Sequence, residues 1–512
     1  MTENNNPDAP EPQEGSNQDQ PDEQPPDLCF SKDSCQRRSE RIRPYRIFIS
    51  YSHDDRWLSD KLEKHLKKEG LLPINDREIR IGETFSQEIR EMIECVHVFM
   101  PLITQDVDYR QWVQQEIGYA MALHVPVCPI AIGNLPAGMT EQIQGIHIDL
   151  ASSVGAEDGE SPEAKKAVER LKERLTYDAI DDLVQRARKR TRQGRYDCAM
   201  CWTEREEMLI EFTNAARRQN CGLIDRLAGK KSYDRDLWRL RQRTAFGSFS
   251  IPDTAISSDA WRIRDPNRYH TEEHRRLLRA ERQAMSEYMR CFGCDLIIDP
   301  RVTIRNPTRA HQKPRETQQT GLDDEAVPNT ESADAPGSTT FKHSPLRTVF
   351  RIRLLIDLIL RHLDDDMLRV VVPPHPGSLT TNLMIVGDWF ATEAVVPHYG
   401  GGAYERTMFT RHAPTVLNMI DRFDQDFRDC LPNPGHDSAP SEAGPEDASG
   451  DANTDSALFR TAKKRVLSDL RKWQKRNEEN MDEEQRGDME KVCEELGLRT
   501  EKDRTGLGRN GT

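Results

Sequence analysis

Two side chains that could act together, Trp112 and Glu116, stand four residues apart in the stretch Tyr109–Leu123 (YRQWVQQEIGYAMAL). At 3.6 residues per turn, Val113 and Ile117 share the face that a helix lays on a sheet, and Glu116 lies about 100° from that stripe. Trp112 precedes it by one turn, within reach. A carboxylate at the margin of a core can be partly desolvated and still stabilise a positive charge on a ligand. The alternative is an ordinary solvated glutamate, which is the usual state of a helix carboxylate.

The sequence before this helix predicts the elements that would position it. Four short runs rich in apolar residues read as strands, namely Ile47–Tyr51, Leu71–Ile74, Val96–Ile103 and Val125–Ile132. Helical patterns lie between them, and this alternation is typical of an α/β fold, a flavodoxin-like doubly wound parallel sheet. In such sheets the ligand crevice lies beyond the carboxyl ends of the strands. The crevice would then be lined by Tyr51 and Ser52, by the loop around Arg80 and Gly82, and by the start of the Trp112 helix.

Three motifs in this region resemble a known family. The segments IFISYSHDD, NDREIRIGETF and WVQQE are similar to motifs of TIR (Toll/interleukin-1 receptor) domains, in the same order, across roughly Tyr45–Leu150. We therefore expect a TIR domain at residues 44–152. The similarity is greatest to the enzymatic members, bacterial defence proteins and the animal axon-degeneration NADase. The chain departs from the family's motifs at Thr104, where many members carry serine, and at Ser52-His53, where the animal enzyme has two basic residues.

The resemblance implies an NAD+ glycohydrolase that cleaves the nicotinamide-ribosyl bond and releases nicotinamide with ADP-ribose or a cyclic variant. NAD+ would be the substrate, and no cofactor is implied. Glu116 would be the catalytic carboxylate. The residues expected to bind the substrate are Tyr51, Ser52, Arg80, Gly82, Phe85 and Trp112.

In such relatives, self-association of TIR domains completes the active site. The resemblance also implies a role in signalling or antiphage defence. A different class of function remains open. A TIR domain can also serve as a non-catalytic scaffold that recruits other TIR domains.

The net charge and the apolar runs of the chain limit which partners and which cellular compartment we expect. The formal net charge is −14, which argues against general coating of nucleic acid. One basic island, Arg186–Arg195, could contact phosphate or RNA, or could be the solvated face of a helix, which we prefer. No apolar run approaches the roughly 20 residues that span a bilayer, and the amino terminus lacks the apolar core of a signal peptide. We therefore expect a cytoplasmic protein with no membrane contact, whose 11 cysteines are reduced thiols.

Two C-x-x-C pairs, Cys198/Cys201 and Cys291/Cys294, raise the question of a zinc site. Four cysteines can hold zinc tetrahedrally, but these pairs are separated by far more sequence than in a compact zinc ribbon. We expect core thiols and no metal.

The rest of the chain divides by composition. We expect an acidic disordered tail at 1–43, a mainly helical region at 158–300, a disordered insertion at 301–343, a small α/β domain at 344–430, a linker at 431–456 and a charged helical tail at 457–512. The small domain resembles half of a phospholipase-D-like domain in the pattern IVGDWF…FTRHAP. It lacks the H-x-K-x-x-x-x-D of that chemistry, so we interpret the carboxyl-terminal region as a regulatory module that senses an unknown trigger.

Overall fold

The structure, a computed structural model, describes residues 43–52, 55–74, 85–103, 111–133, 143, 145–148, 162–191, 196–199, 202–227, 235–245, 272–299, 345–375, 379, 381–395, 407–431 and 453–495. Its internal contacts separate Met1–Arg41 from Ile42–Thr512. All the residues described belong to the second unit. Residues 1–42 of the predicted acidic tail, the predicted insertion at 301–343 and residues 432–452 of the predicted linker lie outside the described residues.

A five-stranded parallel sheet forms the first part of the fold. Its strand order is β2-β1-β3-β4-β5, which is the flavodoxin-like order. The strands are β1 (Arg46–Ser50), β2 (Leu72–Ile74), β3 (Val98–Ile103), β4 (Ile130–Ile132) and β5 (Ile146–Ile148). The predicted fold class is confirmed.

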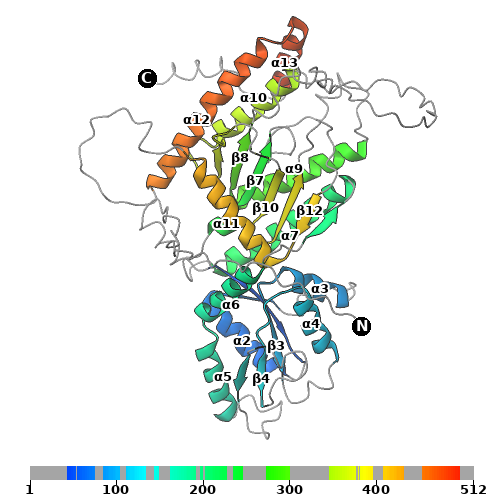
Figure 1. The fold of residues 1–512 in the computed structure, drawn as a ribbon, viewed down its shortest axis with the longest axis vertical. Helices are drawn as coiled ribbons and strands as arrows, with labels where there is room; N and C mark the ends of the chain where they lie inside the picture. Colours follow the sequence, from blue (N-terminus) through cyan, green and yellow to red (C-terminus); the bar gives the residue numbers. More distant parts are fainter. Residues whose placement is uncertain are drawn as a thin grey trace, which may run out of the picture. The chain divides into compact units, whose positions relative to one another are not determined.

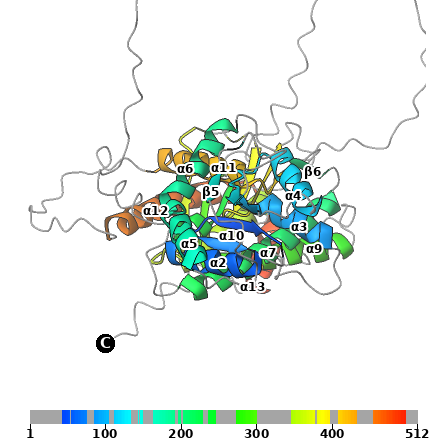
Figure 2. The same cartoon turned by 90° about the horizontal axis from the view of Figure 1, so that it is seen from below.

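Helices cover both faces of this sheet because its strands are apolar on both faces. Figure 2 shows α2 (Arg56–Glu69) beside α5 (Pro162–Arg174), and α3 (Phe85–Cys95) beside α4 (Gln111–Ala122). Along β1, Ile47 and Ile49 join the core that contains the α2 leucines, whereas Phe48 joins the core with α3 and α4. Gly70, with φ of 86°, ends α2 in the left-handed conformation that glycine adopts most readily.

The fourth strand is shorter than the sequence predicts. Pro126 and Pro129 lack the backbone N–H that a ladder requires, and β4 begins only at Ile130. Before it, Val127 makes a single isolated bridge to Phe99. Strand β5, with the sequence IHI, is not among the four predicted strands.

A seven-stranded mixed sheet forms the second part of the fold, in the order β6-β12-β11-β10-β7-β8-β9 (Figure 1). Three of its strands, β7, β8 and β9, run parallel to one another, and the others are antiparallel to their neighbours. The strands are β6 (Asp197–Ala199), β7 (Leu240–Ala245), β8 (Cys294–Asp299), β9 (Leu368–Val371), β10 (Thr381–Val386), β11 (Phe390–Val395) and β12 (Thr407–Thr410).

This sheet joins two regions that the sequence separates. Strands β6, β7 and β8 come from the expected helical region at 158–300, and β9 to β12 come from the small α/β domain at 344–430. Within the region expected to be mainly helical, α7 (Trp202–Leu227) is a long helix, but Leu240–Ala245 forms the strand β7. The β7 sequence LRQRTA carries arginines at alternate positions and looks like an exposed segment. In the structure Arg241 and Arg243 pair with Asp424 and Asp426 of α11 (Ala413–Asp429).

Opposite faces of the second sheet carry different helices. Phe390 contacts Phe212 of α7, with ring centroids 5.5 Å apart, and α7 packs along α9 (Glu272–Phe292). Arg241 points to the other face, where α11 lies (Figure 1). The remaining helices are α6 (Tyr177–Arg190), α10 (Pro345–Arg361), α12 (Asn453–Glu478) and α13 (Glu483–Glu495), with the 3-10 turn η5 (Arg235–Trp238). Within the described residues, no helix has the length and apolarity needed to cross a membrane.

Candidate active site

The Glu116 carboxylate lies beside the end of β1. Helix α4 buries Val113, Ile117 and Ala120 against the sheet, and Glu116 is half-buried next to this stripe, as its position in the helix predicts. The Ser50 hydroxyl donates a hydrogen bond to Glu116 Oε2 at 2.5 Å. A strand residue and a helix residue 66 positions apart are thus brought together.

Alternation along β1 explains why Ser50 meets α4. Residues two apart on a strand face the same side, so Ser50 shares the side of Phe48, whose ring packs with the α4 residues. Ser50 is also the last residue of β1 and pairs with Pro101 of β3. The adjacent carboxyl ends of β1 and β3 are the switch point of this strand order, where ligands bind in such sheets. Sequence reasoning missed Ser50; the signal that could have indicated it is a hydroxyl residue directly after the apolar run Ile47–Ile49.

Two further predicted site residues, Tyr51 and Ser52, follow directly and are both buried. The Tyr51 ring belongs to the core on the α2 side of the sheet, opposite Ser50. The Ser52 carbonyl accepts the Asp55 N–H at 2.8 Å, next to the start of α2.

The other predicted residues are only partly described. Arg80 and Gly82 lie outside the described residues, as does Thr104. Phe85 begins α3 and Trp112 is the second residue of α4, but only their backbones are described. Of the predicted site residues, Tyr51, Ser52 and Glu116 therefore have described surroundings, and the structure brings Glu116 to Ser50.

The C-x-x-C pairs do not converge. Cys198 is in β6 and Cys294 is in β8, with four strands between them. At about 4.8 Å per strand step their backbones lie roughly 24 Å apart, so one zinc ion cannot bind both pairs. Cys294 is buried in the sheet, and burial raises the pKa of its thiol. In the part of the chain that the structure describes, no three His, Cys, Asp or Glu side chains form a metal site.

The turn between β10 and β11 contacts the amino-terminal end of β1. Arg46, the first residue of β1, makes an ion pair of 2.6 Å with Asp388 of that turn, and both side chains are at most 1% exposed. The guanidinium also donates to the Cys95 carbonyl at 2.8 Å and lies 4.1 Å from the Trp389 ring centroid. We call Arg46, His97, Asp388 and Trp389 the buried joint. It lies at the opposite end of β1 from Ser50, about 13 Å away at 3.3 Å per residue.

His97 completes the buried joint as a neutral imidazole. Its Nδ1 accepts the Arg46 backbone N–H at 2.9 Å, so the ring proton is assigned to Nε2, which faces Asp388 Oδ2 at 3.4 Å. Burial, followed by the Arg46 charge, holds the His97 pKa well below its usual value. Asp388 acts in the opposite sense, but Arg46 already compensates its charge.

A chain of hydrogen bonds continues from the joint into the second sheet's helices. Trp389 Nε1 donates to Asn220 Oδ1 of α7 at 2.7 Å, and Asn220 Nδ2 donates to the Tyr288 hydroxyl of α9 at 3.1 Å. The Tyr288 hydroxyl then donates to the Trp238 carbonyl at 2.8 Å. The β10–β11 turn is therefore fixed from both sides.

The basic island is engaged within the chain. Arg188 of α6 donates to Asn418 Oδ1 of α11 at 3.0 Å and also pairs with Asp421. Arg186 pairs with Asp182 at 3.1 Å on the helix surface. Arg186 therefore lies on a solvated helix face, as expected, whereas Arg188 contacts α11; residues 192–195 of the island lie outside the described residues.

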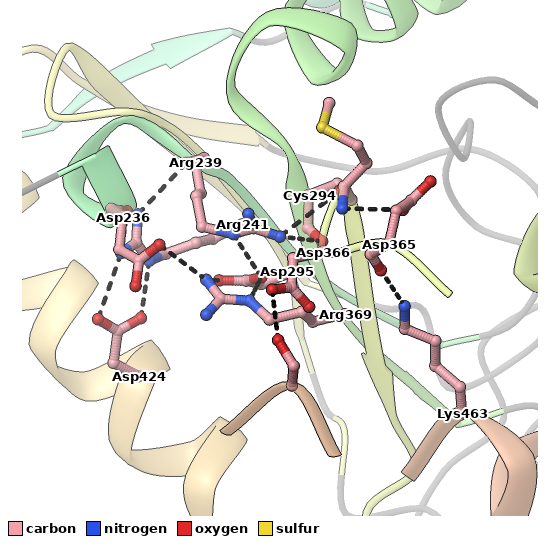
Figure 3. Close-up of polar contacts among 12 residues, drawn as sticks. Asp236, Arg239, Arg241, Cys294, Asp295, Asp365, Asp366, Arg369, Asp424 and Lys463 are labelled. Atoms are coloured by element: carbon pink, nitrogen blue, oxygen red, sulfur yellow. Dashed lines mark hydrogen bonds and ion pairs between the residues drawn. The ribbon is translucent and has the colours of Figure 1, made fainter. Parts of the chain in front are cut away.

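A second buried charge cluster spans β7, β8 and β9 (Figure 3). Strand register aligns Arg241, Asp295 and Arg369 in one row, and Arg369 Nε donates to Asp295 Oδ1 at 2.6 Å. Burial alone would raise the pKa of Asp295, but Arg239 and Arg369 lower it to about 2. Arg241 pairs in turn with Asp424 at 2.7 Å. Because these charges compensate one another, we interpret the cluster as structural.

Comparison with known protein families gives a match over the region that contains the first sheet. No match was found among curated proteins. Residues 47–175 match the family model described as TIR domain, a range that runs from β1 through α5 and covers about a quarter of the chain. It ends later than residue 152, because α5 packs on the same sheet and adds Val168 and Leu171 to its core. Residues 47–175 of the chain therefore carry a TIR domain.

Proposed function

We propose that the protein is an NAD+ glycohydrolase in which Glu116 is the catalytic carboxylate. The observation that carries the proposal is the hydrogen bond of 2.5 Å from Ser50 to Glu116 at the switch point of the sheet. A bare surface glutamate would have many rotamers, whereas this carboxylate is fixed by a hydroxyl from a buried strand. Fixed orientation is what a catalytic group requires.

Cleavage of the nicotinamide-ribosyl bond requires few protein groups besides this carboxylate. Pyridinium is a good leaving group, so nicotinamide departs without protonation, and the transition state resembles an oxocarbenium ion. A carboxylate beside that cation can stabilise its charge, orient a ribose hydroxyl or attack the anomeric carbon. Water or an internal nucleophile then completes the reaction to ADP-ribose or a cyclic product.

Ser50 acts as a positioning residue in this proposal. Its hydroxyl holds Glu116 Oε2, so Ser50→Ala would leave the carboxylate present but less well oriented. We expect kcat to fall roughly 10- to 100-fold, the scale of a small misplacement, with KM little changed. Ser50→Thr keeps the hydroxyl and should restore part of the rate.

The remaining site residues and the control of activity are also proposals. Tyr51, Ser52, Arg80, Gly82, Phe85 and Trp112 would bind NAD+. Association of TIR domains from several copies would complete the site, and the carboxyl-terminal region would hold assembly back until it meets its trigger. The buried joint is a candidate for that control, because it ties β1 to the second sheet at the end of the strand far from Glu116.

The test measures nicotinamide released from NAD+ by the purified full-length protein, at low concentration and under crowded conditions that promote assembly. Glu116→Gln should abolish release while the circular dichroism spectrum is retained. Glu91→Gln, an exposed carboxylate on α3, is the matched control and should retain full activity. If the wild type and Glu116→Gln release nicotinamide equally under both conditions, the enzyme proposal fails and the TIR scaffold takes its place.

A further inference from the structure

Two cysteines on neighbouring helices bring their sulfurs together. Cys221 of α7 and Cys291 of α9 lie with their Sγ atoms 3.7 Å apart, although 70 residues separate them in the chain. Both are reduced thiols in the structure, Cys291 exposed and Cys221 half-buried. An attacking reagent can therefore reach at least one of the two sulfurs.

The helices hold this pair in register. Arg217 lies one turn before Cys221 on α7, and Glu287 lies one turn before Cys291 on α9. The two side chains form an ion pair of 2.8 Å. Asn220, the residue before Cys221, is hydrogen-bonded to Tyr288, three residues before Cys291. Two interhelical contacts within about one turn of the cysteines therefore hold this part of α7 against α9.

We propose that Cys221 and Cys291 form a dithiol–disulfide site, a role that does not depend on NAD+ cleavage. A disulfide needs the sulfurs about 2.05 Å apart, a closure of roughly 1.7 Å that side-chain rotation can supply. The other cysteine near this position, Cys294, is fully buried in β8 and cannot meet a reagent without unfolding.

The oxidant is a small-molecule disulfide such as glutathione disulfide. The Cys291 thiolate attacks one of its sulfurs, which breaks the S–S bond, forms a mixed disulfide and releases one glutathione thiolate. The Cys221 thiolate then attacks the Cys291 sulfur and releases the second glutathione. Two protein thiols are oxidised to one disulfide, the reagent is reduced to two thiols, and the two protons pass to those thiols.

The position of the disulfide gives it a structural consequence. It would covalently join α7 to α9 beside Asn220 and Tyr288, which hold the β10–β11 turn through Trp389. A cross-link between residues far apart in sequence restricts the unfolded chain. The oxidised protein should therefore unfold at a higher temperature than the reduced protein.

The experiment incubates the reduced full-length protein with glutathione disulfide, blocks the remaining thiols with iodoacetamide and identifies cross-linked peptides by mass spectrometry. We expect a Cys221–Cys291 peptide, loss of two titratable thiols and a raised Tm that dithiothreitol reverses. Cys221→Ser should instead accumulate a glutathione adduct on Cys291, with no rise in Tm. Cys430→Ser, which removes a half-buried cysteine elsewhere, should behave like the wild type.

Two results would overturn the proposal. One is stable glutathionylation of Cys291 in the wild type with no Cys221–Cys291 peptide at any ratio of glutathione disulfide to glutathione. The other is a Cys221→Ser protein whose thiol count and Tm shift match those of the oxidised wild type. The Tm of each reduced variant is measured first, so that a folding defect is distinguished from loss of the cross-link.

Discussion

Neutralising Asp388 tests whether the buried joint contributes to stability. Asp388→Asn keeps the size of the side chain and the backbone carbonyl that binds Arg46, but leaves the Arg46 charge almost fully buried without its counterion. At an effective dielectric constant near 20, two charges 2.6 Å apart attract by about 6 kcal/mol, and desolvation of both ions offsets part of this. Removing one partner of a buried pair typically costs about 3–5 kcal/mol in the free energy of unfolding, and we expect that range here.

A double-mutant cycle isolates the pair. Arg46→Met alone should cost a similar amount, because it leaves Asp388 buried and charged. The double variant removes both charges, so it should be about 2–3 kcal/mol more stable than the sum of the single effects predicts. The control is Asp182→Asn, which breaks an ion pair whose side chains are 56% and 65% exposed and should cost less than about 0.5 kcal/mol.

The assay is equilibrium unfolding in urea, followed by tryptophan fluorescence, for which Trp389 against Arg46 is a reporter, and by circular dichroism. Coincident transitions are required before a free energy is extracted. Single variants that each lose less than about 1 kcal/mol, with additive effects in the double variant, would refute the assignment of Arg46 and Asp388 as a buried, mutually compensating pair.

Three further predictions concern buried groups. Because burial and Arg46 keep His97 neutral in the folded state, the unfolded chain takes up a proton below about pH 6.5 that the folded chain does not. The free energy of unfolding should then fall by up to about 1.4 kcal/mol per pH unit on acidification, and pH-dependent urea titrations of His97→Gln should lose this slope. Burial and then Glu281 raise the pKa of Glu206, so the folded chain retains a proton above the unfolded pKa and loses stability as pH rises; Glu206→Gln should raise the Tm at pH 8 and leave it unchanged near pH 4. Gly387 has φ of 53°, and a Cβ there would lie 2.6 Å from the Tyr288 hydroxyl, so Gly387→Ala should cost about 1–3 kcal/mol in urea unfolding, and an unchanged midpoint would contradict this geometry.

Local patterns were enough to predict much of the first sheet. The apolar run around Ile47 and the stripe of Val113 and Ile117 specify a buried strand and a helix that covers it, because hydrophobic periodicity is a local property. The same stripe placed Glu116 at the rim of the core. Prolines and very short strands weaken such patterns, which is why β4 was overextended and β5 was missed.

The contacts between distant residues could not be predicted from local patterns. The Ser50–Glu116 hydrogen bond depends on which face of β1 meets α4, and the register of β1 sets this. No local pattern in β7 indicates that Arg241 pairs with Asp424 of α11. Arg46 and Asp388 are 342 residues apart, and no local pattern can encode their pairing. Charge compensation and strand pairing of this kind arise only when the folded chain removes both partners from water together, so the sequence determined the elements and the packing decided which side chains meet.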